Sequence, residues 1–147
     1  MGVSNNSPKI FLDSNFLVGL YATSDSLHQK CLSLSTRLAS QPGTKLYISN
    51  YVLTEVLTVL SQRAGKKTAI TAGEKIIESK YFTIVQHNTE SDILAWRLFK
   101  QVENKNTSFI DVAIIRRMKL EGISNLTTFD IQLAKLAKAH KIKVLQS

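Results

Sequence analysis

Short apolar runs alternate along the chain with longer stretches in which apolar residues recur every three or four positions. The runs predict five strands, at residues 9–12, 45–49, 81–86, 123–129 and 142–145. Helical periodicity predicts helices in the segments between them, at residues 16–21, 27–38, 51–63, 66–80, 89–102, 109–120 and 131–140. Strands that alternate with helices are typical of a parallel sheet. We therefore expect an α/β fold whose central parallel sheet carries helices on both faces.

No internal repeat, low-complexity tract or linker interrupts this order. A chain of 147 residues is the length of one domain and is long enough to bury a core. Its two prolines and six glycines are too few to indicate a long disordered segment. We expect a single domain over residues 1–147, with its core between about residues 9 and 145.

The charge of the chain is strongly unbalanced. It has 19 lysines and arginines against 11 aspartates and glutamates, which gives a formal net charge of +8. A basic surface favours polyanions, with RNA or DNA first and an anionic membrane second. The acidic residues are therefore informative wherever they occur in apolar surroundings.

Several classes of protein are excluded by what the sequence lacks. It has no run of 18 apolar residues, so we expect no membrane-spanning helix. Residues 1–9 lack the apolar segment of a secretory signal, so we expect a cytoplasmic protein. The single cysteine, Cys31, excludes an internal disulfide and a cysteine-based zinc site. Neither glycine-rich motif for a nucleotide phosphate is present.

Two acidic residues stand directly after predicted strands. Asp13 ends the first strand, and Asp130 follows the fourth. Each is also a good helix N-cap, so capping is an alternative interpretation of either residue alone. The two roles are compatible, because the N-terminus of a helix favours a negative charge. In a parallel sheet, binding sites form beyond the carboxyl ends of the strands, which is where both residues are expected.

Two further acidic residues, Glu55 and Asp111, lie within very apolar predicted helices. Valines and leucines surround Glu55 so closely that we expect its carboxylate near the core on any rotation of the helix. A buried carboxylate must be paired, or it takes up a proton. A core ion pair is the alternative for both. For Asp111, however, Arg116 and Arg117 are five and six positions away and point largely elsewhere.

Together the four acids suggest one convergent cluster. Carboxylates packed together repel each other, and their pKa values rise unless a cation is present. Without thiols or histidines at ligand spacing, the cation expected is Mg²⁺ or Mn²⁺, which prefer oxygen. On a basic protein, such a site matches the hydrolysis of a phosphodiester by a metal-activated water. The placement of the acids therefore predicts a metal-dependent nuclease.

At these residues the chain resembles a PIN domain, in particular the single-domain ribonucleases of the VapC toxin type. The first motif is an apolar strand, an aspartate, a small residue and an asparagine, here residues 10–15. The second is a glutamate in an apolar helix after the second strand, here residues 49–57. The third is a hydroxyl residue, two apolar residues and an aspartate that opens an apolar helix, here residues 108–115. The fourth is Thr-x-Asp after a strand, here residues 128–130.

The resemblance implies an α/β/α sandwich and a Mg²⁺- or Mn²⁺-dependent endoribonuclease. It implies that Asp13 and Asp111 are the principal metal ligands and that Glu55 and Asp130 complete the acidic pocket, so that all four are catalytic. The supporting polar residues, which would orient water or the carboxylates, are then Asn15, Ser108 and Thr128. Family members are often homodimers, and toxin members are neutralised by a small antitoxin protein.

Contacts to the phosphates of RNA are expected from basic residues, although a solvated surface is the alternative for each. The candidates are Arg63, Lys66, Lys67, Arg117, Lys135 and Lys138.

Two other functions compete with the nuclease. A phosphatase of the haloacid dehalogenase class also begins with a strand and Asp-x-Asp, but Asn15 stands at the position of its second aspartate. A non-catalytic, PIN-like RNA-binding module is the other. Four retained acids argue against that module, because carboxylates repel RNA unless a metal lies between them.

Overall fold

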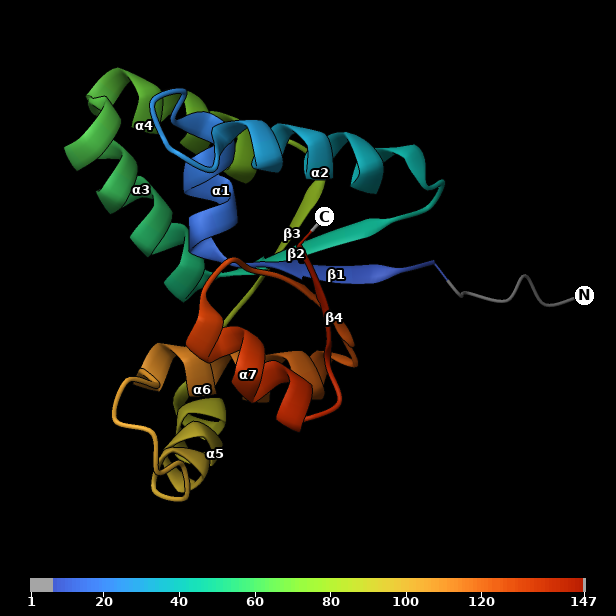
Figure 1. Ribbon diagram of the computed structural model, residues 1–147, viewed down its shortest axis with the longest axis vertical. Coiled ribbons are helices and arrows are strands. Elements are labelled where there is room, and N and C mark those ends of the chain that lie inside the picture. Colours follow the sequence, from blue (N-terminus) through green and yellow to red (C-terminus); the bar gives the residue numbers. More distant parts are fainter. Residues whose placement is uncertain (1–6, 147) are drawn as a thin grey trace, which may run out of the picture.

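The computed structural model describes residues 7–146, in which five parallel strands form one sheet in the order β3-β2-β1-β4-β5 (Figure 1). Every neighbouring pair is parallel, which confirms the predicted parallel sheet. The strands are β1 (Lys9–Leu12), β2 (Lys45–Ser49), β3 (Phe82–Val85), β4 (Asn125–Thr127) and β5 (Lys143–Leu145). The expectation of no secretory signal concerns residues 1–9, of which residues 1–6 lie outside the described residues.

Helices cover both faces of the sheet, which confirms the three-layer α/β/α architecture (Figure 1). One face carries α1 (Ser14–Tyr21), α2 (His28–Ser40), α3 (Asn50–Ala64), α4 (Lys66–Gly73) and the π-helical turn η1 (Glu74–Glu78). The other carries α5 (Thr89–Phe99), α6 (Phe109–Glu121) and α7 (Ile131–Ala139). This division follows from right-handed crossovers, because the chain moves from β1 toward β3 and then in the opposite direction through β4 to β5. No helix among the described residues is long and apolar enough to cross a membrane.

The predicted elements differ from the observed ones mainly at their ends. The strand expected at residues 123–129 is limited to β4, because β1 and β5 pair with it only from Asn125 to Thr127. The helix expected at residues 66–80 divides into α4 and η1, with Ile76 buried in the wider turn.

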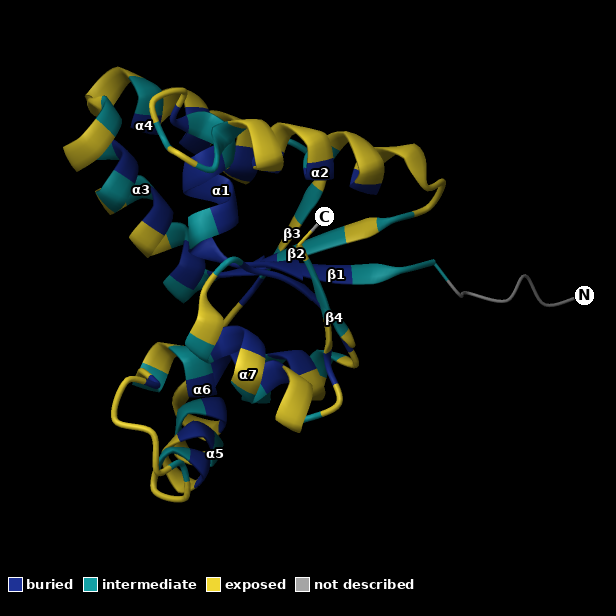
Figure 2. Cartoon of the chain, viewed as in Figure 1, coloured by how far each residue is buried: buried dark blue, intermediate teal, exposed yellow. Residues whose placement is uncertain are grey.

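The core lies on both sides of the sheet and is densest at β1 and α6. Ile10, Phe11 and Leu12 are all buried, as expected for the central strand of a parallel sheet (Figure 2). The middle of α6 is a continuous buried stretch, residues 112–115. The buried strand β1 therefore leads directly into Asp13, and the buried stretch of α6 follows directly after Asp111.

Candidate active site

The site lies at the carboxyl ends of β1 and β4, where the strand order reverses direction. Asp13 follows β1, and the segment 128–130 follows β4, its neighbour in the sheet. The backbone N–H of Asp13 donates to the carbonyl of Thr127 at 3.0 Å, so the two chain segments leave the sheet side by side. Crevices at such switch points are the usual ligand sites of open α/β sheets.

Asp13 is a buried carboxylate held by two hydrogen bonds. The Ser14 N–H donates to its Oδ1 at 2.8 Å, and the Thr128 hydroxyl donates to its Oδ2 at 2.7 Å. Burial raises the pKa of Asp13 to about 6 despite these bonds, and the charges of Glu55 and Asp111 raise it further. Asp13 also caps α1 through Ser14, so the capping role and the place in the acidic cluster coexist.

Asp111 is in the first turn of α6 and is half-buried. It forms a capping box with Ser108, in which the Ser108 N–H donates to Asp111 Oδ2 and the Asp111 N–H donates to Ser108 Oγ, both at 3.0 Å. Burial is the main cause of its raised pKa, and the charges of Asp130 and Glu55 also raise it. The core ion pair considered for Asp111 is absent among the described residues.

Glu55 is exposed, so the expectation that it lies near the core on any rotation of its helix is wrong. Val52, Val56 and Leu60 occupy the buried face of α3, and the carboxylate projects from another. It lines a hollow of about 300 Å³ together with Asn15 and Arg63. From there its charge still raises the pKa of both Asp13 and Asp111, so its carboxylate lies near the other two.

Asp130 is exposed at the start of α7, where its Oδ1 accepts the N–H of Leu133 at 2.9 Å. Its own N–H donates to Thr128 Oγ1 at 3.0 Å. The expected capping role is confirmed, and the charge of Asp130 is close enough to Asp111 to raise the pKa of that carboxyl.

Asn15 supports this edge of the sheet by accepting the N–H of Phe129 on Oδ1 at 3.2 Å. Thr128 connects two acids, because its hydroxyl donates to Asp13 and accepts from the N–H of Asp130. The supporting polar residues therefore bond either to an acid or to the loop that presents one.

The carboxylates of this site suit a divalent cation that keeps some of its waters better than one coordinated by protein side chains alone. Within residues 7–146 no three His, Cys, Asp or Glu side chains are close enough to hold one ion together. Mg²⁺ needs only one or two protein carboxylates, because it retains several of its waters. A cation would also relieve the repulsion and burial that raise the pKa of Asp13 and Asp111. The chemistry of these residues thus fits an ion held by Asp13 and Asp111 through oxygen.

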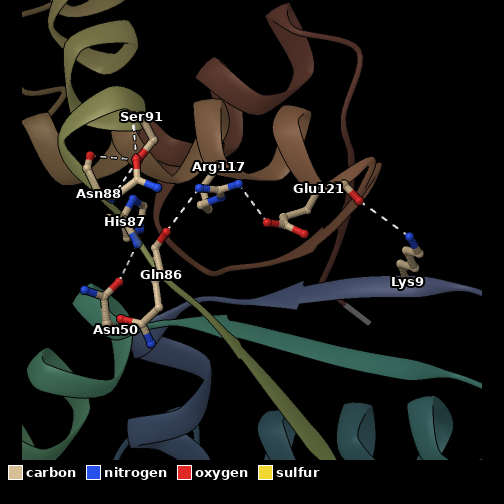
Figure 3. Close-up of polar contacts among 8 residues, drawn as sticks. All are labelled: Lys9, Asn50, Gln86, His87, Asn88, Ser91, Arg117 and Glu121. Atoms are coloured by element: carbon tan, nitrogen blue, oxygen red, sulfur yellow. Dashed lines mark hydrogen bonds and ion pairs between the residues drawn. The ribbon is translucent and has the colours of Figure 1, made fainter.

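The basic candidates separate into two groups. Lys66, Lys67, Lys135 and Lys138 are exposed, and Arg63 lines the hollow beside Glu55. Arg117, by contrast, is already engaged: Nη1 donates to the carbonyl of Gln86 at 3.1 Å, and Nη2 pairs with Glu121 at 2.7 Å (Figure 3). The structure therefore places Arg63 at the hollow beside Glu55, whereas Arg117 connects the end of β3 to α6.

Tyr51 and His87 lie beside the site and were missed in the sequence. Their rings stack at 4.0 Å, and the Tyr51 hydroxyl donates to Asp92 at 2.6 Å. His87 is 7% exposed, burial lowers its pKa to about 4, and neither ring nitrogen has a hydrogen-bond partner among the described residues. Asn50 accepts the backbone N–H of His87 at 2.7 Å (Figure 3). No sequence signal joins these residues, because their contact depends on β2 and β3 being neighbours.

Comparison with known proteins matches the PIN domain over residues 10–142. The chain belongs to the PIN domain family. The match contains all four acids and all three supporting polar residues, and it removes the haloacid dehalogenase alternative. PIN domains are nuclease domains, which agrees with the acidic pocket at this sheet edge.

Relatives of this PIN domain include the 23S rRNA-specific endonuclease VapC20 of Mycobacterium tuberculosis. It is 29% identical over 122 residues, which cover 82% of this chain and 88% of the relative. The crystal structure of VapC20, described as a sarcin-ricin loop cleaving toxin, superposes with a TM-score of 0.76 at 26% identity, covering 86% of this chain and 94% of that one. The fold is also that of VapBC2 from Rickettsia felis bound to promoter DNA, with a TM-score of 0.60, 17% identity and coverage of 93% and 97%.

Proposed function

We propose that this PIN domain is a divalent-metal-dependent endoribonuclease that hydrolyses RNA phosphodiester bonds in its acidic pocket. The observation that carries the proposal is the Asp13–Thr128–Asp130 connection at the switch point, with Asp111 and Glu55 close enough to raise the pKa of Asp13. The chain has a net charge of +8, which attracts a polyanion such as RNA. Its four clustered acids would repel RNA unless a cation lies between them and the phosphates.

Asp13 and Asp111 would hold the metal, Mg²⁺ or Mn²⁺. When bound, the ion supplies Lewis acidity toward the phosphodiester and lowers the pKa of a coordinated water. Thr128 keeps Oδ2 of Asp13 in place, and Ser108 keeps Oδ2 of Asp111 in place. At the exposed rim, Glu55, and Asp130 through the oxygen that does not cap α7, would accept a proton from water or orient it.

RNA is the substrate class best supported by the relatives and by the charge. VapC20 is named for its action on 23S rRNA, so structured ribosomal RNA is the first substrate to test on this chain. Arg63, Lys66 and Lys67 continue from the acidic pocket along the end of α3 and the start of α4, where phosphates flanking the cut would be held.

Family membership also suggests partners and a setting. We propose a homodimer in the cytoplasm, neutralised by a small antitoxin as a VapC-type toxin. On α5, Ile93 and Trp96 are one turn apart and both exposed, so they form an apolar surface of the kind that a second copy covers.

The test is cleavage of purified ribosomal RNA and of a single-stranded RNA oligonucleotide, with Mg²⁺, with Mn²⁺ and with excess EDTA. The proposal predicts internal cuts that require the metal. RNA binding without any cleavage under every metal condition would instead support the non-catalytic RNA-binding module.

A further inference from the structure

A second group of basic residues lies on α6 and α7, away from the acids. Arg116 and Lys119 are three residues apart, so their side chains project from the same face of α6. His140 caps the C-terminus of α7, which packs against α6. Burial lowers the pKa of His140, and the charges of Arg116 and Lys119 lower it further, which places all three groups in one neighbourhood.

This cluster lacks a compensating acid in the part of the chain that the structure describes. Arg116 forms no ion pair and no hydrogen bond there, and its Nε is buried without a partner. Its neighbour Arg117 also has a buried Nε without a partner, but Glu121 and the Gln86 carbonyl bind its two Nη atoms. An anion bound at the cluster would relieve the repulsion among its three basic groups.

The direction of the two helices connects this cluster to the active site. Both α6 and α7 begin at the carboxyl edge of the sheet, with Asp111 and Asp130, and end near its amino edge. Lys119 is eight residues after Asp111, which is about 12 Å along the helix at about 1.5 Å per residue. Because residues 112–115 of α6 are buried, a nucleic-acid strand that leaves the pocket toward Arg116 and Lys119 passes over α7, which packs against α6 and carries the exposed Lys135 and Lys138.

We propose that Arg116 and Lys119, with His140 beside them, bind backbone phosphates of the substrate RNA on one side of the cleavage point. The inference rests on the proposed ribonuclease function and adds the path of the RNA. Arginine suits this position because its planar guanidinium donates two parallel hydrogen bonds to a phosphate. An acidic protein segment is the other class of anion. The observations favour RNA, because the cluster continues the helices that present the catalytic acids.

The experiment measures the dissociation constant of a fluorescein-labelled single-stranded RNA, and its salt dependence, by anisotropy in EDTA. Wild type is compared with Arg116→Gln/Lys119→Gln and with the matched control Lys30→Gln/Arg37→Gln on α2, across the sheet. We expect the α6 variant to bind about tenfold more weakly and to lose about two from the slope of log K against log salt, with the control near wild type. Lys119→Gln alone, at an exposed position, should lose about one from the slope while folding normally.

Equal losses in both double variants would overturn the proposal, since net charge alone would then explain binding. Unchanged RNA affinity in the α6 variant would also overturn it. If that variant lost affinity for poly-glutamate and not for RNA, the cluster would serve an acidic protein segment instead. Cleavage of the same RNA by wild type with Mn²⁺ is assayed in parallel. If wild type cleaves the RNA but the α6 variant binds it normally, only the proposed path of the RNA is refuted. If wild type does not cleave the RNA, the proposed ribonuclease function is refuted.

Discussion

The hydroxyl of Thr128 donates to Oδ2 of Asp13 at 2.7 Å, across 115 positions of the sequence. The hydroxyl oxygen of Thr128 also accepts the backbone N–H of Asp130 at 3.0 Å. One threonine side chain therefore joins the acid at the end of β1 to the acid at the end of β4. Because Asp13 is buried, its carboxylate depends on this bond and on the Ser14 N–H for its orientation.

Replacing Thr128 with valine should preserve the shape of the residue and remove this connection. We expect metal-dependent RNA cleavage to fall by about 10- to 100-fold, as for other groups that orient a metal ligand. The free energy of unfolding should fall by about 1–3 kcal/mol, because a buried carboxylate oxygen loses its donor. Thr128→Ser, which retains the hydroxyl, is the control. Equal cleavage by the valine and serine variants would refute the role of the bond.

Metal binding should stabilise the folded protein. At a metal concentration about 100-fold above the dissociation constant, linkage gives about 2.7 kcal/mol, or about 5–10 °C in Tm for a chain of this size. Thermal unfolding of wild type with and without Mn²⁺ measures the shift. Asp13→Asn should lose most of it, and Glu78→Gln, which neutralises an exposed acid far from the pocket, should retain it. A shift that persists in Asp13→Asn would place the metal elsewhere.

His87 should make the protein sensitive to acid. Burial lowers its pKa from 6.5 to about 4, so below pH 6.5 the unfolded chain takes up a proton that the folded chain does not. The stability associated with neutral His87 is complete above pH 6.5 and is lost as the pH falls through about 4. The loss amounts to about 3 kcal/mol by pH 4.

His87→Phe tests this prediction, because phenylalanine retains a ring against Tyr51 and removes the titrating group. Urea unfolding of both proteins from pH 7 to pH 4 should show a shallower loss of stability for the variant. At pH 7 the variant should be at least as stable as wild type, since two buried nitrogens without partners are removed. Parallel pH profiles for the two proteins would contradict this assignment.

The parallel sheet and the acidic edge were predictable because they depend on local patterns. Alternating strands and helices determine the layers, and strand-end aspartates such as Asp13 lie at the carboxyl edge in any parallel sheet. The connection through Thr128 was predicted only in general terms from the family motif. The specific hydrogen bond requires β1 and β4 to be neighbours, which the order of elements alone does not determine.

The errors have a common physical origin in helix rotation and in contacts between distant segments. Glu55 was expected near the core because apolar residues surround it, yet the rotation of α3 leaves it exposed. Arg117 was a candidate for contact with phosphate, and the structure shows its guanidinium bound by Gln86 and Glu121. A sequence gives the period of a helix more reliably than the direction of one side chain on it.

The central claim is that the acids at the switch point form one metal-dependent catalytic site for RNA, and its most direct test is cleavage by purified acid variants. Wild type, Asp13→Asn, Asp111→Asn and the control Glu78→Gln are compared on the same RNA, with Mn²⁺ and with EDTA. We predict a loss of at least about 100-fold for each aspartate variant, since a bound metal contributes several kcal/mol to such reactions. The circular dichroism spectra should match that of wild type, and the control should retain activity. Cleavage at the wild-type rate by folded Asp13→Asn or Asp111→Asn, or undiminished cleavage in EDTA, would contradict the account.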